Sequence, residues 1–183
     1  MNDGIIGQKW PQEWYGEDVC QAARHLLGAI LIHVIGDKFY AGRIVETEAY
    51  GGSFQGCPDD AAHSFRGRTA RTEPMFRPGG CSYVYQIYGM YYCMNVVTGR
   101  AGSGEAVLIR AVEPLSGLED MFRNRHMDIH TRSPQYLTNG PGKLCQAMEI
   151  TKAQNMLDLC GDELYIAEPA VRRPLKVSCS ARI

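Results

Sequence analysis

Two short runs of residues, 82–87 and 91–97, flank Gly89, and together they restrict the fold of this chain more than any other feature. Both runs are rich in aromatic and β-branched residues, which favour strands, and a glycine in a short connection permits a tight turn. The pair is therefore predicted to form a β-hairpin. Further strands are predicted at residues 29–34, 39–50 and 106–111.

Helices are expected between these strands, at residues 17–27, 118–124 and 141–148. Gly28 is placed to end the first helix, and Pro141 lies near the first turn of the third, with Asn139 as its candidate N-cap. Residues 51–80 form a stretch rich in Gly, Pro, Asp and Arg, and a loop of this length inside a small domain is usually functional or mobile. No repeat or linker divides the chain, so a single domain, 1–183, is expected.

Composition excludes several classes of protein. No run of about 18 apolar residues is present, so no membrane span is expected. The N-terminus lacks the basic start and apolar stretch of a secretory signal. The seven cysteines are an odd number without a Cys-x-x-Cys pair, which argues against both a disulfide framework and a zinc site. We therefore expect a non-secreted protein with reduced thiols and no metal.

The charge of the chain gives a mixed indication about nucleic acids. The formal net charge is −1, whereas proteins that hold DNA mainly by bulk electrostatics are basic. Basic side chains nevertheless gather in the long loop and near the C-terminus, and local patches of this kind can serve a small footprint. They are Arg66, Arg68, Arg71, Arg77, Arg172, Arg173, Lys176 and Arg182.

The predicted hairpin is unusually rich in tyrosine. Five of the ten tyrosines lie within residues 83–92. Because aromatic residues are common in strands, a well-packed sheet is an equally good explanation of this cluster. Tyr88 differs from the others because it stands beside the turn, and hairpin tips are normally solvated. It is therefore a candidate functional residue.

A carboxylate, Glu48, interrupts an otherwise apolar strand segment, and two interpretations of it stay open. It is either ion-paired, with Arg110 as its natural partner, or held for acid–base chemistry. Glu46 and Glu48 would lie about 7 Å apart on an extended strand, which leaves an inverting sugar hydrolase as a second candidate function. His63 and Asn95, taken alone, are compatible with purely structural roles.

Five blocks of sequence follow one another in a fixed order: RIVETEAY at residues 43–50, AAHS at 61–64, YVYQIYGMYYCMN at 83–95, VLIRAVEP at 107–114 and GPGKLCQA at 140–147. Together they resemble the signature of the alkyladenine (3-methyladenine) DNA glycosylase family. The resemblance runs from the first predicted helix to the last residues. It implies a mixed α/β (α+β) fold, a single domain in which helices surround a curved, largely antiparallel β-sheet.

The resemblance implies an enzyme that extrudes a damaged purine (alkylated, deaminated or etheno) from duplex DNA, because a glycosidic bond inside the base stack is out of reach. Tyr88 is the implied wedge that fills the vacated space. Tyr50 would stack on one side of the flipped base, and His63 and Tyr85 on the other. Asn95 would stand where a purine 2-amino group points, which discourages normal guanine.

The implied chemistry is hydrolysis through a positively charged sugar, which leaves an abasic site. Glu48 would activate the attacking water and stabilise that charge, while Arg110 and the main-chain carbonyl of Ile183 would help to hold the water. The pocket motifs contain no lysine, so a monofunctional glycosylase without strand cleavage is expected. The residues matching DNA-backbone contacts are Thr69, Arg71, Met90, Tyr91 and Lys143.

The implied partner is double-stranded DNA containing damaged purines, and the resemblance implies no cofactor, no membrane and a monomer. The expected location is the cytoplasm, associated with the nucleoid, in a bacterium or the nucleus in a eukaryote. Family members continue beyond Ile183, so the glycosylase domain is expected to be shortened at its C-terminus. The alternative function is therefore a damaged-base-binding protein that flips bases without cutting.

Overall fold

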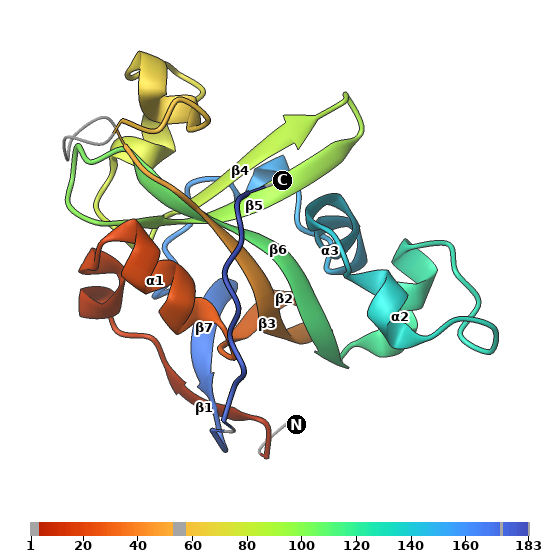
Figure 1. The fold of residues 1–183 in the computed structure, drawn as a ribbon. Helices are drawn as coiled ribbons and strands as arrows, with labels where there is room; N and C mark the ends of the chain where they lie inside the picture. Colours follow the sequence, from red (N-terminus) through yellow and green to blue (C-terminus); the bar gives the residue numbers. More distant parts are fainter. Residues whose placement is uncertain (1–3, 53–57, 173, 183) are drawn as a thin grey trace.

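The computed structural model describes residues 4–52, 58–172 and 174–182, and its centre is a seven-stranded sheet (Figure 1). The strands lie in the order β1-β7-β2-β3-β6-β5-β4, and each neighbouring pair is antiparallel. Their bounds are β1 (Ile6–Lys9), β2 (Ile30–Ile35), β3 (Lys38–Tyr50), β4 (Ser82–Ile87), β5 (Tyr91–Thr98), β6 (Glu105–Ser116) and β7 (Leu164–Pro169). The predicted mixed α/β class with a curved antiparallel sheet is confirmed.

The three α-helices share one face of this sheet, the main-core face, and the 3-10 helix η3 (Glu73–Phe76) packs on the other. The α-helices are α1 (Val19–Leu26), α2 (Leu118–Asn124) and α3 (Pro141–Ala147), and the 3-10 helices are η1 (Gln12–Gly16), η2 (His63–Arg66), η3 (Glu73–Phe76), η4 (Pro134–Leu137) and η5 (Lys152–Gln154). α1 lies against β3, and α3 lies against β5 and β6. Leu26 of α1 and Leu144 of α3 belong to one buried cluster with Met94 and Ile109 of the sheet. This cluster is the main hydrophobic core.

The sequence predicts the end of α1 well and its start less well. The helix was expected over residues 17–27 but begins at Val19, because the Asp18 side chain caps it by accepting hydrogen bonds from the amides of Cys20 and Gln21. Gly28 follows the helix with a φ of 86°, a conformation that favours glycine. The role predicted for Gly28 is thus confirmed.

The predicted cap of α3 is wrong. The N-cap position is occupied by Gly140, which supplies no side-chain hydrogen bond. Asn139 instead accepts a hydrogen bond of 2.9 Å from Lys143 Nζ, one helical turn further on. Pro141 does lie in the first turn, where its missing amide hydrogen costs nothing.

Two strands at one end of the sheet were not predicted. They are the edge strand β1, with four residues, and its neighbour β7, which pairs with both β1 and β2. β6 is longer than the predicted 106–111, because residues as far as Ser116 pair with β3. The long loop of residues 51–80 contains η2 and η3 in its described part.

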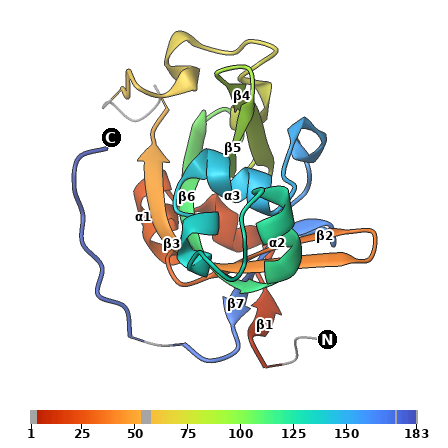
Figure 2. The ribbon, with the colours of Figure 1, turned by 90° about the vertical axis from the view of Figure 1, so that its right-hand side faces the viewer.

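The C-terminal segment, residues 174–182, runs as extended chain along the outside of α1 and β3 (Figure 2). Its Leu175 side chain fits over Gly28, where an added Cβ would lie only 2.7 Å from Leu175 Cδ1. We call residues 174–182 the strap. Among the described residues, no helix has the length and apolar character needed to cross a membrane.

Candidate active site

Four residues from four neighbouring strands form one row across the sheet. Glu48 of β3 pairs with Leu108 of β6, Leu108 pairs with Asn95 of β5, and Asn95 pairs with Tyr83 of β4. Directly paired residues point to the same face of a sheet, so these side chains share one face. The residues next to them in sequence point the other way, into the main core: Val84, Met94, Val96, Val107 and Ile109.

Glu48 is buried, with 7% of its surface exposed, and two side chains orient it. The Tyr50 hydroxyl donates a hydrogen bond of 2.9 Å to Glu48 Oε2, and Arg110 Nη1 lies 3.5 Å from Glu48 Oε1. Burial and the bond to Glu48 raise the pKa of Tyr50 to about 12, so its hydroxyl remains a donor at neutral pH. The carboxylate is therefore fixed at both oxygens.

Arg110 pairs with Glu48 as the sequence predicts, but it also binds Glu46. Its Nε donates a hydrogen bond of 3.1 Å to Glu46 Oε1. The pairing register of β3 shifts on both sides of Glu46, and such irregularities re-aim side chains. The two carboxylates thus share one cation, whereas the acid and base of an inverting sugar hydrolase stand on opposite sides of the sugar.

An aromatic cluster adjoins this carboxylate. The His63 and Tyr85 rings meet edge to face with centroids 4.6 Å apart, and Tyr83 and Tyr85 lie 5.2 Å apart. His63 Nδ1 lies 2.8 Å from the Tyr83 hydroxyl. Burial, reinforced by the Arg71 charge, lowers the pKa of His63, so the ring is neutral at pH 7. Tyr83 is a member of the site that sequence reasoning missed, although it alternates with Tyr85 on the same strand.

Asn95 and Arg71 also contact this cluster. The buried Asn95 side chain donates a hydrogen bond of 3.0 Å to the Tyr83 carbonyl from its Nδ2 atom. The Arg71 guanidinium lies 5.5 Å from the Tyr85 ring centroid. The structure thus brings Arg71, expected at the DNA backbone, against the aromatic cluster. In the same loop, the hydroxyl oxygens of Thr69 and Thr72 lie 3.1 Å apart.

The hairpin tip projects Tyr88 away from the sheet. Its residue surface is 86% exposed, and its φ of 50° is unusual for a residue with a side chain. The next residue, Gly89, has a φ of 69°, and the Met90 amide donates a hydrogen bond of 3.2 Å to the Ile87 carbonyl. Positive φ at both central positions is the geometry of a type I′ hairpin turn.

The remaining residues expected at the DNA backbone lie beside this tip and at the start of α3. Met90 and Tyr91 are exposed. A Cβ at Gly142 would come within 3.1 Å of Tyr91 Cβ, so the first turn of α3, which carries the exposed Lys143, packs against the hairpin. These three residues therefore lie near one another.

A second feature not singled out in the sequence is a cation at the Tyr50 ring. The Arg182 guanidinium is 4.7 Å from the Tyr50 ring centroid, and its Nη1 donates to the Ala49 carbonyl at 2.8 Å. Both of its terminal nitrogens bind the Asp59 carboxylate. The sequence shows Arg182 only as one member of a basic cluster, and no local pattern relates it to Asp59. The expected water-holding residue, Ile183, lies outside the described residues.

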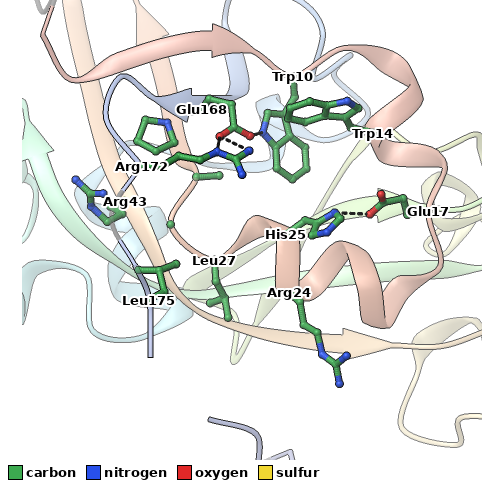
Figure 3. Close-up of a pocket in the computed structure, with 13 residues that line it drawn as sticks. Trp10, Trp14, Glu17, Arg24, His25, Leu27, Arg43, Glu168, Arg172 and Leu175 are labelled. Atoms are coloured by element: carbon green, nitrogen blue, oxygen red, sulfur yellow. Dashed lines mark hydrogen bonds and ion pairs between the residues drawn. The ribbon is translucent and has the colours of Figure 1, made fainter. Parts of the chain in front are cut away.

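Two cavities flank the strap. One, of about 460 Å³, is lined by the indoles of Trp10 and Trp14 together with Glu168 and Arg172 (Figure 3). It contains no residue of the Glu48 site, and within it Glu168 pairs with Arg172 and Glu17 with His25. The other, a groove of about 890 Å³ between the strap and β3, is lined by Glu46, Glu48 and Arg182 among others.

Comparison with known proteins identifies the family. The family model described as "Methylpurine-DNA glycosylase (MPG)" matches residues 13–183. Among curated relatives, a Clostridium acetobutylicum protein is 48% identical over 86% of this chain and 77% of its own length. A Desulfitobacterium hafniense protein is 49% identical over 86% of this chain and 78% of its own length. A Chlorobium phaeobacteroides protein is 44% identical over 96% of this chain and 85% of its own length.

All three relatives carry the name "Putative 3-methyladenine DNA glycosylase". The family match covers the strands that carry Glu48, Arg110 and the aromatic cluster. The resemblance carried by the five sequence blocks is thereby confirmed, and the chain belongs to the methylpurine-DNA glycosylase family.

Proposed function

We propose that this protein flips a damaged purine out of duplex DNA and hydrolyses its N-glycosidic bond with a water activated by Glu48. The proposal rests on one observation above all: a buried carboxylate, oriented by Tyr50 and Arg110, stands beside an aromatic cluster large enough to stack a base. A general base must be held in a defined direction toward the water that it deprotonates. Two partners hold Glu48 in that way.

The flipped base stacks between Tyr50 on one side and His63 and Tyr85 on the other. Stacking on aromatic side chains contributes about 1–3 kcal/mol per base, which offsets part of the few kcal/mol needed to unstack it. A neutral His63 presents no charge that would repel a cationic alkylated base. Asn95 discriminates against the 2-amino group of normal guanine.

Hydrolysis proceeds as positive charge develops on the sugar. Glu48 takes a proton from the attacking water, and its negative charge stabilises the developing cation. The new bond joins the water oxygen to the sugar carbon, and the bonding pair leaves with the purine. The product is an abasic site, with the DNA strand intact, released by a monomeric enzyme.

Binding to DNA combines the wedge with local basic contacts. Tyr88 enters the gap left by the flipped nucleotide, as exposed side chains at hairpin tips can do. Met90, Tyr91, Lys143 and Thr69 contact the backbone around it. A small contact surface of this kind is consistent with a chain whose net charge is −1.

The experiment uses duplex oligonucleotides that each carry one hypoxanthine or one ethenoadenine. Native protein is expected to yield strand breaks only after alkali, and Glu48→Gln none. Glu46→Gln is the matched control, because it touches the same arginine yet is expected to retain activity. Lesion-specific binding without cleavage by the native protein would instead establish the alternative, a flipping protein that does not cut.

A further inference from the structure

The Asp59 carboxylate connects three separate parts of the chain around the base pocket. It accepts hydrogen bonds from the Gly51 amide at 2.9 Å and the Ala61 amide at 3.2 Å. It also binds both terminal nitrogens of Arg182, with 2.6 Å between Nη2 and Oδ1. Paired hydrogen bonds between arginine and carboxylate fix direction as well as distance.

These contacts adjoin the residues expected to stack on the base. Gly51 directly follows Tyr50, and Ala61 stands two residues before His63. One carboxylate therefore holds the backbone near Tyr50 and near His63, which are expected to lie on opposite sides of the base. The Arg182 guanidinium completes the arrangement by lying 4.7 Å from the Tyr50 ring centroid and donating to the Ala49 carbonyl.

The strap that carries Arg182 is attached at both ends. Near its start, the Leu175 side chain packs against Gly28, and near its end Arg182 binds Asp59. Between these points it borders the groove that reaches Glu48. The strap is thus held by the packing of Leu175 near its start and by the ionic hydrogen bonds of Arg182 near its end.

Both members of the pair remain charged in the neutral range. The Arg182 guanidinium holds the pKa of Asp59 below its usual range, and Asp59 in turn raises the pKa of Arg182. The pair therefore places a positive and a negative charge next to Tyr50. While both are present, their opposite charges partly offset each other near the ring.

We propose that Asp59 and Arg182 form a positioning clamp that sets the spacing of the aromatic pocket and balances its preference between cationic and neutral damaged purines. The inference deepens the proposed function and rests on it. A cation against an aromatic ring draws on the same electron density that attracts a cationic base. Asp59 neutralises that effect, so the two residues act on selectivity with opposite signs.

The test compares two duplexes that differ only in the lesion, cationic 7-methylguanine or neutral hypoxanthine. The readout is the ratio of their single-turnover excision rates. Arg182→Gln leaves the Asp59 charge uncompensated and should shift this ratio toward 7-methylguanine by roughly 3- to 10-fold. Asp59→Asn leaves the Arg182 charge uncompensated and should shift it toward hypoxanthine by a similar factor.

Two further variants separate electrostatics from structure. Arg182→Lys keeps the charge without the paired hydrogen bonds, so both rates should fall while their ratio stays near the native value. Arg172→Gln removes an exposed cation that is paired with Glu168, away from the pocket, and should leave the ratio unchanged. If Arg182→Gln and Asp59→Asn slow both lesions by the same factor, the pair is only structural and the selectivity inference is wrong.

Failure of the proposed function would be recognised separately. The same ratio is measured as relative affinity for the two duplexes in the Glu48→Gln background, where cleavage plays no part. Opposite shifts in affinity would support the clamp even if the native protein did not cleave. Native protein that neither binds nor cleaves either lesion would overturn both proposals.

Discussion

The Tyr50 hydroxyl donates its hydrogen bond to Glu48, 2.9 Å away and two residues earlier on the same strand. The side chain expected to stack on the base therefore also orients the carboxylate expected to activate water. Binding and chemistry share one residue, and the two contributions can be separated because only the chemistry needs the hydroxyl.

Tyr50→Phe keeps the ring and removes the donor to Glu48. A hydrogen bond to a charged group contributes about 1.5–3 kcal/mol, so the single-turnover excision rate should fall at least about 10-fold while affinity for lesion DNA changes little. Rates and affinities are measured on the same duplex. Equal losses in rate and affinity would show that the hydroxyl serves binding rather than orientation of Glu48.

Tyr88→Asn should make the protein more stable and less active. Tyr88 has a φ of 50°, which costs a residue with a side chain about 1–2 kcal/mol, whereas asparagine adopts this conformation readily. The melting temperature should rise, and excision from duplex DNA should fall because the wedge is lost. Tyr88→Phe keeps both ring and strain, so it should match the native protein in both measurements. A lower melting temperature for Tyr88→Asn would show that the backbone conformation of Tyr88 does not destabilise the native protein.

Glu105→Gln should stabilise the protein at neutral pH. Glu105 is buried, its Oε2 has no hydrogen-bond partner among the described residues, and burial followed by the Asp18 charge raises its pKa. For a carboxyl with a raised folded pKa, stability is lost as pH rises from the unfolded pKa, about 4.3, through the folded one. Native and variant melting temperatures should therefore converge near pH 4 and separate by pH 7. If the melting temperatures of the native and variant proteins differ by the same amount at every pH, the burial of charged Glu105 does not destabilise the protein.

His63 should limit the binding of cationic lesions only in acid. Its pKa lies below the ordinary value through burial and the Arg71 charge. Affinity for 7-methylguanine DNA should therefore stay constant from pH 8 down to about 6.5 and weaken below that, as His63 gains a proton. Arg71→Gln should move the midpoint of this loss to higher pH, whatever its effect on overall affinity. An unchanged midpoint would show that Arg71 does not act on His63.

The sequence predicts those parts of the site that depend on strands and on local spacing. The hairpin around Gly89, the strand ending at Tyr50 and the pairing of Glu48 with Arg110 all follow from short patterns, and the structure has all three. The family resemblance adds roles for these residues but not their contacts.

What the sequence does not predict depends on contacts between distant residues. Asp59 and Arg182 are 123 residues apart, and no periodicity links a loop aspartate to an arginine in the strap. The second pairing of Arg110, to Glu46, follows from an irregular register between β3 and β6. β1 has only four residues, too few to show a pattern of its own, and β7, although as long as β2 and β4, was not predicted.

The row from Glu48 to Tyr83 has a consequence for the order in which the site forms during folding. Asn95 and Tyr83 meet through a local hairpin, whereas Glu48 and Leu108 are joined only when strands separated by some sixty residues find each other. Closing a long loop costs more chain entropy than closing a short one, so distant pairings form more slowly. We therefore expect Tyr83 and Tyr85 to be brought together with Asn95 before β3 adds Glu48 and Tyr50 to the pocket.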